Sequence, residues 1–333
     1  MGMTVLLNVR NLETRFKVRK GYVYAVNGVS FQLQAGETLG VVGESGCGKT
    51  VTMLSLLQLL PPAARIVNGR ALFESQDLLQ MNKRQLRKVR GAQIGMIFQD
   101  PMTSLNPVVN IGLQMSEPLV YHRGMNMPQA LQRSAELLEM AGIPDGQARL
   151  RDYPYQLSGG MRQRVMIAMA LACQPKILIA DEPTTALDVT IQAQIVELVK
   201  ELRDELGTAI VWITHDLGVI AGLAERVMVM YAGFVVEEAA VDDLYDDPRH
   251  PYTVALLNSL PSVSETKGHR LASIGGSPPD LISRPHFCPF LPRCRYAIDK
   301  CRTENPPIRP APGIDDPRHR IACWVDVRER SQA

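Results

Sequence analysis

Short apolar runs alternate with longer segments in which apolar residues recur every three or four positions. Runs rich in β-branched residues at 38–42, 94–98, 177–180 and 209–213 predict strands. The segments between these runs have helical spacing. This alternation predicts an α/β domain with a mainly parallel sheet.

The pattern changes between residues 99 and 157. Apolar residues keep near-helical spacing from Ala130 to Ala141, and no run in this stretch is typical of a strand. We interpret residues 100–160, approximately, as a helical subdomain inserted into the α/β core. No tandem repeat of the domain is visible, so we expect one core per chain.

Proline spacing divides the chain near residue 260. Twelve prolines lie in residues 1–260, and 11 lie in the 73 residues that follow. Because proline interrupts helices and central strands, residues 261–333 are predicted to form an irregular extension rich in Pro and Cys. Residues 1–260 are predicted to form the α/β domain.

The composition excludes several classes of protein. Of the 333 residues, 46% are hydrophobic and 21% are charged, as in globular proteins, and the net charge of +2 gives no electrostatic footprint for nucleic acid. The N-terminus has no secretory signal, and the longest strongly apolar run, residues 165–173, is too short to span a bilayer. We therefore expect a cytoplasmic protein with at most a peripheral role at a membrane.

Residues 43–50 read GESGCGKT, a full match to the phosphate-binding motif G-x-x-x-x-G-K-[ST]. The motif lies between a predicted strand and a predicted helix over residues 51–60, which is the context that distinguishes it from an incidental glycine turn. In such loops backbone N–H groups surround the phosphates, the lysine reaches the β and γ phosphates, and the final hydroxyl binds Mg²⁺. The predicted nucleotide-binding residues are Gly43, Glu44, Ser45, Gly46, Cys47, Gly48, Lys49, Thr50 and Val51. We expect the Cys47 backbone N–H to matter more than its thiol.

Two carboxylates follow the apolar run 177–180. Asp181 and Glu182 therefore emerge at the end of a strand apolar enough to be central in the sheet, where open α/β sheets bind ligands. We assign Asp181 to Mg²⁺ and Glu182 to general base or water positioning. An acidic cap of the next helix is the alternative interpretation.

A second glycine turn, LSGGMRQR at residues 157–164, leads into another apolar helix and is a second candidate anion site. Together with the strand and carboxylates that follow it, this motif resembles the signature motif of ABC-type ATPases. The resemblance implies a P-loop NTPase core that works as a head-to-tail pair. In this pair the signature loop of one subunit covers the γ-phosphate held by the phosphate loop of the other. The implied interface residues are Leu157, Ser158, Gly159, Gly160, Met161, Gln163 and Asp188.

Other motifs of this family occur in the expected order, so the resemblance covers nearly the whole chain. Gln99 resembles the Q-loop glutamine, which senses Mg²⁺ and water, and TALD at residues 185–188 resembles the D-loop that crosses the dimer interface. His215 resembles the switch histidine that contacts the γ-phosphate. The resemblance thus implies that Glu182, His215 and Gln99 are catalytic, and that Thr50, Gln99 and Asp181 serve Mg²⁺.

The family stacks the adenine of ATP on an aromatic residue that precedes the lysine. We choose Phe16 for this role, with Tyr22 and Tyr24 as alternatives. A phenylalanine at this position is also compatible with a place in the core.

Three features narrow the branch of the family. QDPMTSLNP at residues 99–107, RHPYT at residues 249–253 and a cysteine-bearing tail together resemble the ATP-binding subunits of dipeptide, oligopeptide and nickel importers. The tail is most similar to that of dipeptide-permease subunits. The resemblance implies ATP hydrolysis that powers the import of di- or oligopeptides.

The same resemblance implies partners and a location. The partners are two integral-membrane permease subunits, an extracytoplasmic substrate-binding protein and a second ATPase, which we expect to be a homologous different chain. The location is the cytoplasmic face of the inner membrane.

Three alternative functions stay open. They are an importer of nickel or another small solute, a soluble ABC ATPase, and an iron-sulfur sensor that binds ATP.

Four of the six cysteines, Cys288, Cys294, Cys301 and Cys323, lie in the predicted extension. Their spacing, C-x5-C-x6-C-x21-C, does not suit the closely spaced cysteine pairs of structural zinc sites. Four thiolates on an irregular segment can hold a 4Fe-4S cluster, and the resemblance to the permease group implies one. We expect this cluster, in a structural role, rather than zinc or free thiols.

Overall fold

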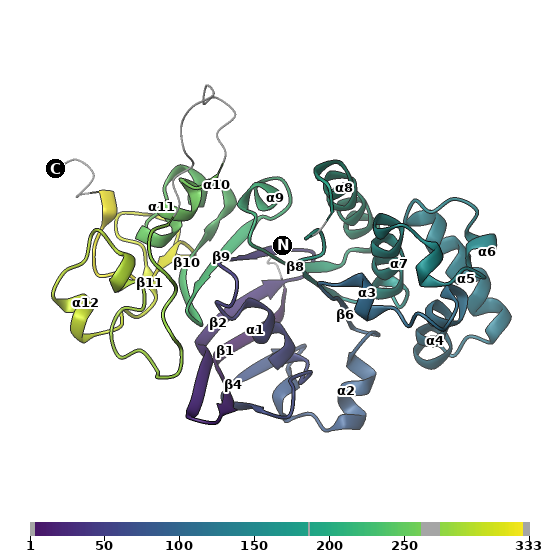
Figure 1. Ribbon diagram of the computed structural model, residues 1–333, viewed down its shortest axis with the longest axis horizontal. Coiled ribbons are helices and arrows are strands. Elements are labelled where there is room, and N and C mark those ends of the chain that lie inside the picture. The colour runs from purple at the N-terminus through teal and green to yellow at the C-terminus, as the bar shows by residue number, and fades with distance from the viewer. Residues whose placement is uncertain (1–3, 186, 261–273, 329–333) are drawn as a thin grey trace. The chain divides into compact units, whose positions relative to one another are not determined.

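The computed structural model describes residues 4–185, 187–260 and 274–328 (Figure 1). The chain forms two compact units. Unit 1 is formed mainly by Gln34–Thr38 and Gln80–Ile213, and unit 2 by Val5–Leu33, Leu39–Leu79 and the chain from Thr214 onward.

Unit 1 contains three parallel strands, in the order β6-β7-β8. These strands are β6 (Ile94–Ile97), β7 (Ile177–Asp181) and β8 (Ala209–Thr214). Every residue of β7 and β8 is buried, which explains why these runs are continuously apolar rather than alternating. The predicted parallel strands of this unit are confirmed.

Helices fill the chain between β6 and β7, and the described residues of this stretch contain no strand. The helices α4 (Ile111–Arg123) and α5 (Met127–Met140) pack against each other, and their N-caps Asn110 and Asn126 accept hydrogen bonds from the first turns. The other helices of unit 1 are α2 (Lys83–Val89), α3 (Pro101–Ser104), α6 (Gly146–Arg149), α7 (Gly159–Leu171) and α8 (Val189–Leu206), with a 3-10 turn, η2, at Pro154–Gln156.

Unit 2 contains an antiparallel arrangement that the apolar runs did not predict. Its strands, in the order β2-β1-β4-β5, are β1 (Val5–Val18), β2 (Gly21–Gln34), β4 (Ala64–Phe73) and β5 (Gln76–Asp77). β1 pairs with β4 in an antiparallel register that is interrupted between Arg10 and Thr14. The helix α1 (Lys49–Leu56) follows β3 (Thr38–Val42) and ends four residues earlier than predicted.

In unit 2 the sheet that contains β3 is mixed rather than wholly parallel. β3 pairs parallel with β9 (Arg226–Tyr231), but β10 (Phe234–Ala240) runs antiparallel to β9. The reason is the two-residue turn between β9 and β10, where Ala232 and Gly233 both have positive φ, 51° and 82°. Such a turn closes a tight hairpin, and a hairpin joins antiparallel strands.

The described residues 274–328 have little regular structure, as the proline content predicts. The last strands, β11 (Arg309–Pro310) and β12 (Arg320–Ile321), extend the sheet from β10. The remaining elements are η1 (Leu78–Gln80), α9 (Leu217–Ala221), α10 (Val241–Asp246), α11 (Pro251–Leu257), η3 (Leu291–Arg293) and α12 (Lys300–Thr303). The predicted domain boundary after residue 260 adjoins residues 261–273, which lie outside the described residues, and it stays a prediction.

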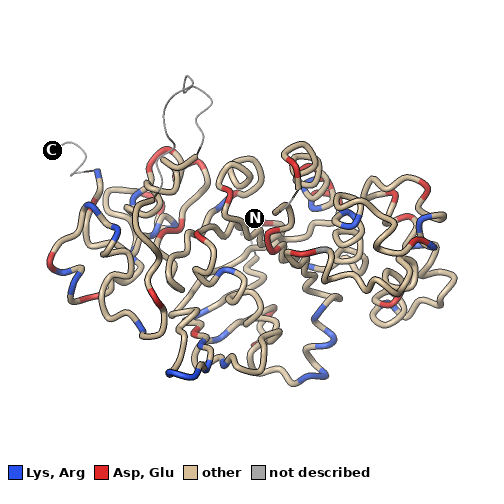
Figure 2. The backbone as a smooth tube through the Cα atoms, in the orientation of Figure 1, with Lys and Arg blue, Asp and Glu red and all other residues tan. Residues whose placement is uncertain are grey.

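The distribution of charged residues and the hydropathy of the helices agree with what the composition predicts. Acidic and basic residues are interspersed along both units, and the basic run on α2 is confined to one short helix (Figure 2). None of the helices in the described ranges is long and apolar enough to cross a membrane.

Candidate functional site

The phosphate loop of unit 2 connects β3 to α1 and requires glycine at two positions. Gly43 and Gly48 have φ of 151° and 101°. A Cβ at Gly43 would lie 2.2 Å from Met230 O, and one at Gly48 would lie 2.3 Å from Ala25 O. A side chain would therefore meet both an unfavourable backbone conformation and a backbone carbonyl.

Lys49 is buried within this loop. Its Nζ donates hydrogen bonds to the carbonyl oxygens of Gly43 (2.7 Å) and Glu44 (3.1 Å), and the residue is 3% exposed. The N-cap of α1 is Gly48, which supplies no side-chain acceptor to the first turn of the helix. A helix N-terminus beside a buried ammonium suits an anion such as a phosphate.

The other predicted residues of the loop differ in exposure. Ser45 and Gly46 are exposed, whereas Thr50 and Val51 are half-buried at the start of α1. Cys47 is buried, and burial raises the pKa of its thiol, while its carbonyl accepts a hydrogen bond from Gly233 N (2.9 Å). The thiol is therefore protonated at neutral pH.

The residues proposed for adenine lie on the antiparallel sheet of unit 2. Phe16 is half-buried in β1 and stands opposite Ala64 of β4. Among the alternatives, the ring of Tyr22 lies 4.2 Å from the guanidinium of Arg15. The choice of Phe16 stays a prediction.

In unit 1, the carboxyl ends of β6 and β7 bring Gln99 and Glu182 together. Gln99 Nε2 donates to Glu182 Oε2 (3.3 Å), and Thr185 Oγ1 donates to the same oxygen (3.0 Å). Glu182 has φ of 46°, a left-handed conformation that costs a residue with a side chain roughly 1–2 kcal/mol. Asp181, the last residue of β7, is buried at 3% exposure. Strained backbone of this kind is concentrated at functional sites.

The switch-histidine candidate belongs to unit 2. His215 is exposed and follows β8 directly, where the chain turns into α9. Asp216 fixes this turn, because its N–H donates to Thr214 Oγ1 (3.0 Å) and its carboxylate accepts from Gly218 N (2.8 Å). The candidate residues are therefore divided between units, with Lys49 and His215 in one and Gln99 and Glu182 in the other.

The signature loop of unit 1 is an exposed helix start. Ser158 is the N-cap of α7 and accepts a hydrogen bond from Met161 N (3.3 Å). A Cβ built on Gly159 would meet no heavy atom within 4 Å. Ser158 and Gly159 are both exposed.

Three other residues predicted for the subunit interface lie differently. Leu157 and Gln163 are 3% and 1% exposed, so their side chains are covered by the chain itself. Asp188 is exposed and caps α8 by accepting a hydrogen bond from Ile191 N (2.9 Å). Ala186, in the predicted D-loop, lies outside the described residues.

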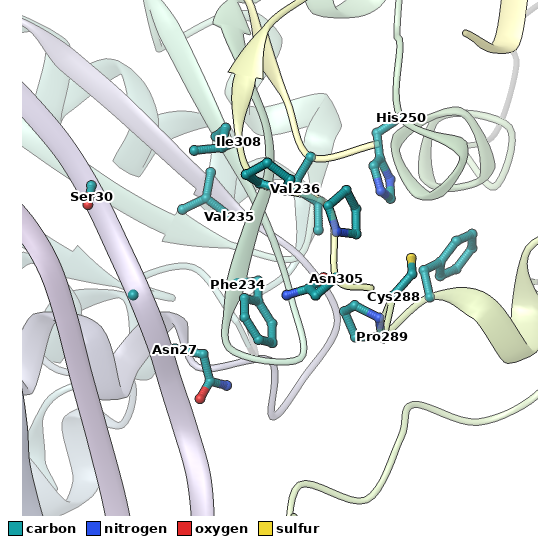
Figure 3. Close-up of a pocket in the computed structure, with 15 residues that line it drawn as sticks. Asn27, Ser30, Phe234, Val235, Val236, His250, Cys288, Pro289, Asn305 and Ile308 are labelled. Atoms are coloured by element: carbon teal, nitrogen blue, oxygen red, sulfur yellow. The ribbon is translucent and has the colours of Figure 1, made fainter. Parts of the chain in front are cut away.

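The four cysteines of the extension all lie in unit 2. Cys288, Cys301 and Cys323 are buried, Cys294 is half-buried, and Cys288 N donates to Cys301 O (3.0 Å). Burial raises the pKa of Cys288 to about 12 and that of Cys323 to about 11, and the neighbouring thiols add to both shifts. Cys288 also lines a cavity of about 210 Å³ together with His250 (Figure 3).

The described residues nevertheless contain no group of three or more His, Cys, Asp or Glu side chains arranged to hold a metal ion. The geometry therefore does not support the predicted 4Fe-4S cluster. All four cysteines are free of disulfides, and the raised pKa values of Cys288 and Cys323 keep these two thiols protonated at neutral pH.

Two side chains that the sequence did not predict hold the phosphate loop at Glu44. The Glu44 carboxylate forms an ion pair with Arg293, and Glu44 N donates to Tyr252 Oη (2.8 Å). The motifs that contain these partners, PRC at residues 292–294 and RHPYT at residues 249–253, are visible in the sequence. The contacts are not, because 249 positions separate Glu44 from Arg293.

A phosphate loop, a carboxylate at the end of a buried parallel strand and a second glycine turn on a helix define an ATP-binding cassette. Residues 26–185 match the family of ABC transporters, and residues 236–301 match the C-terminal region of oligopeptide and dipeptide transporters. The chain belongs to the ABC transporter ATP-binding family.

Individual relatives agree with this assignment. The dipeptide transport ATP-binding protein DppD of Bacillus subtilis (strain 168) is 48% identical over 332 residues, which cover 99% of this chain and 98% of DppD. The oligopeptide transport ATP-binding protein OppD of Salmonella typhimurium (strain LT2) is 49% identical over 325 residues, covering 98% and 95%. A dimeric ATP-binding cassette solved with ADP and Pi bound is 30% identical over 71% of this chain and 98% of its own, with a TM-score of 0.64.

Proposed function

We propose that the chain is the ATP-binding and hydrolysing subunit that powers an ABC importer of di- or oligopeptides. The observation that carries the proposal is the Glu182 carboxylate, held by Gln99 and Thr185 at a strained strand end. The chain also has a complete phosphate loop, and it is similar over nearly its full length to dipeptide and oligopeptide transport ATP-binding proteins.

Each unit contributes its own chemistry. In unit 2, backbone N–H groups of the phosphate loop and Lys49 bind the phosphates of ATP. In unit 1, Glu182 orients the attacking water and accepts its proton, while the Gln99 amide holds the carboxylate in place. The family pattern gives Thr50 and Asp181 as the residues that hold Mg²⁺, which neutralises phosphate charge when bound.

We infer that two such subunits sandwich ATP, with the signature loop of one covering the phosphate loop of the other. The exposure of Ser158 and Gly159 supports this arrangement, since both are accessible to a partner. Val189, next to Asp188 of the D-loop, is 84% exposed and is therefore also accessible to a partner. The related cassette solved with ADP and Pi is a dimer.

The remaining partners are proposed to be two integral-membrane permease subunits and an extracytoplasmic substrate-binding protein. We expect the chain to lie peripherally on the inner membrane. Exposed apolar side chains in the helical part of unit 1 support contact with another protein, among them Met102 (63%), Val108 (80%) and Tyr121 (58%).

The Glu182→Gln variant tests this function. With ATP and Mg²⁺ it should stay closed on its nucleotide, so its complex can be purified from detergent-solubilised membranes of the host and identified by mass spectrometry. We expect two permease subunits and a second ATPase. A matched preparation of Lys49→Ala should not show the ATP-dependent closure. Recovery of soluble proteins alone, such as ribosomal or DNA-repair components, would contradict the importer.

We further propose that the four cysteines of the extension form one ligand set for a 4Fe-4S cluster. The proposal rests on the resemblance to the permease group and on the hydrogen bond from Cys288 N to Cys301 O (3.0 Å). It requires the thiols to move closer together, because the described side chains are not arranged to hold a metal ion. Anaerobically purified protein should contain equal amounts of iron and acid-labile sulfide, and Cys288→Ser should lose both. Cys173→Ser, a buried cysteine outside the set, should keep them. Absence of iron and sulfide from the unchanged chain would contradict the cluster.

A further inference from the structure

A bidentate ion pair between Glu44 and Arg293 connects the phosphate loop to the cysteine-bearing segment. Arg293 Nη1 lies 2.6 Å from Glu44 Oε2, and Arg293 Nη2 lies 2.9 Å from Glu44 Oε1. The Arg293 side chain is 2% exposed and that of Glu44 is 27% exposed. Paired hydrogen bonds between a guanidinium and a carboxylate fix geometry as well as neutralise charge.

The environment of Arg293 satisfies the whole guanidinium. Beyond Glu44, its N–H groups donate to Gly275 O (2.9 Å), Ile274 O (3.1 Å) and Tyr231 Oη (3.3 Å). All five guanidinium N–H groups therefore have an acceptor. These contacts, above all the Glu44 carboxylate, raise the pKa of Arg293 further, so it is charged at every accessible pH.

The backbone N–H and carbonyl groups of Glu44 are hydrogen-bonded as well. Its N–H donates to Tyr252 Oη (2.8 Å), and its carbonyl oxygen accepts from Lys49 Nζ (3.1 Å) and Cys47 N (3.3 Å). The ring of Tyr252 packs against Tyr231, with 4.6 Å between ring centroids. The residue next to the first glycine of the loop is thus fixed from both sides.

A carboxylate in this loop creates an electrostatic problem. The loop binds phosphate, and an uncompensated negative charge beside it would repel the ligand. Arg293 supplies the opposite charge and turns the carboxylate toward itself.

We propose that Arg293 is a positioning residue for the phosphate loop, through which the cysteine-bearing segment controls nucleotide affinity. The proposal rests on the proposed function, because it requires the loop to bind ATP. Arg293 closes the 3-10 turn η3, whose C-cap is Cys294 and whose first N–H, from Leu291, donates to Cys288 O (3.1 Å). The residue that holds Glu44 therefore lies in the same turn as these two cysteines.

The test measures the affinity of the whole chain for fluorescent ATP and ADP analogues. Arg293→Gln removes the charge and should weaken ATP binding about tenfold, and ADP binding less, because ADP carries less charge. Arg293→Lys keeps the charge and should stay within about threefold of the unchanged chain. Arg295→Gln is the matched control, because Arg295 flanks Cys294 on its other side, is exposed and stacks on Tyr296 instead.

A rescue distinguishes charge compensation from general support of the fold. In the double variant Glu44→Gln/Arg293→Gln no carboxylate remains uncompensated, so ATP affinity should return to within about threefold of the unchanged chain. A folded Arg293→Gln with unchanged affinity would overturn the proposal, as would a double variant that binds no better than Arg293→Gln.

Two further outcomes are informative. If Arg293→Gln alone fails to fold, as judged by its thermal melt, the double variant carries the test, and a tenfold loss of affinity in the double variant would overturn the proposal. Failure of the unchanged chain to bind ATP would refute the proposed function instead, so the two failures are distinguishable.

Discussion

The molecule has two glycine loops that lead into helices, and they are built in opposite ways. In the phosphate loop, Gly43 and Gly48 adopt positive φ and lie against backbone carbonyls, so the chain itself fills the space around them. In the signature loop, Gly159 has neither property, and space beside it is open. Arg293 and Tyr252 hold the start of the phosphate loop at Glu44. In the signature loop, Ser158 caps the helix, and Arg162 and Arg164 in its first turns donate to Pro154 O and Ala141 O.

The difference shows that the fold itself requires glycine in the phosphate loop but not at residue 159. At residues 43 and 48 only glycine fits the conformation of the chain. At residue 159 alanine would also fit the chain, because an added Cβ would meet no heavy atom within 4 Å. The open space beside Gly159 leaves room for the partner subunit that we propose.

The largest expected effect distinguishes ATP hydrolysis, assigned to Glu182 in unit 1, from ATP binding, assigned to Lys49 in unit 2. Glu182→Gln should lower the rate of ATP hydrolysis by roughly 10²–10⁴-fold, because the amide cannot accept the proton of the attacking water. Its affinity for ATP should stay near that of the unchanged chain, since the phosphate loop is intact. Lys49→Ala should lose binding itself. Steady-state hydrolysis and filter binding check these outcomes, and near-normal turnover of Glu182→Gln would remove it from its assigned role.

Alanine substitutions should change the folding stability very differently in the two loops. Gly48→Ala should cost at least about 2 kcal/mol of folding free energy, because the added Cβ meets Ala25 O and φ is 101°. Gly159→Ala should change stability by less than about 0.5 kcal/mol.

Gly159→Ala should nevertheless lower ATP hydrolysis, if its open side is where the partner subunit approaches. Urea unfolding gives the two stabilities and steady-state turnover gives the activity. Unaltered activity of Gly159→Ala would show that its glycine is not needed by a partner.

Acid should weaken the bracing of the phosphate loop. Burial lowers the pKa of His250 to about 3, and its Nδ1 accepts a hydrogen bond from Tyr252 N (3.1 Å). The unfolded chain binds this proton near pH 6.5, so stability is complete above pH 6.5 and falls toward pH 3, by up to about 1.4 kcal/mol per pH unit.

His250→Asn keeps an N-cap acceptor for α11 and removes the titration. Urea unfolding at several pH values between 7 and 4 should therefore give a shallower decline for His250→Asn than for the unchanged chain. Equal slopes would mean that other groups cause the acid sensitivity.

The smallest effect is expected at Cys47. Its thiol is buried and protonated, and its polar contact with Gly233 uses the carbonyl. Cys47→Ser preserves the backbone and should change ATP affinity by less than about threefold. A larger change, measured by equilibrium binding, would give the side chain a part in the nucleotide site.

Prediction from sequence succeeded where a local pattern determines the structure. Continuous apolar runs identified β7 and β8, and the phosphate motif located loop residues whose glycines the structure requires. The hairpin of β9 and β10 was not predicted, because its turn residues are Ala232 and Gly233 rather than the usual Asn-Gly or Asp-Gly.

Long-range contacts could not be predicted from periodicity. The pair of Glu44 and Arg293 joins residues that only the folded chain brings together. Likewise, Gln163 belongs to a motif assigned to the interface, yet its burial depends on how α7 packs. The resemblance to the permease group implied a cluster, but neither resemblance nor cysteine spacing determines ligand geometry.

The central claim is that the signature loop of one subunit completes the ATP site of another. Hydrogen exchange of Glu182→Gln, purified with its partners and mixed with ATP and Mg²⁺, tests it most directly. We predict slower exchange in residues 43–50 and also in residues 157–164, with the protection of the signature loop lost when the complex is diluted until its subunits separate. Protection confined to residues 43–50, or protection of both loops that persists on dilution, would contradict the claim.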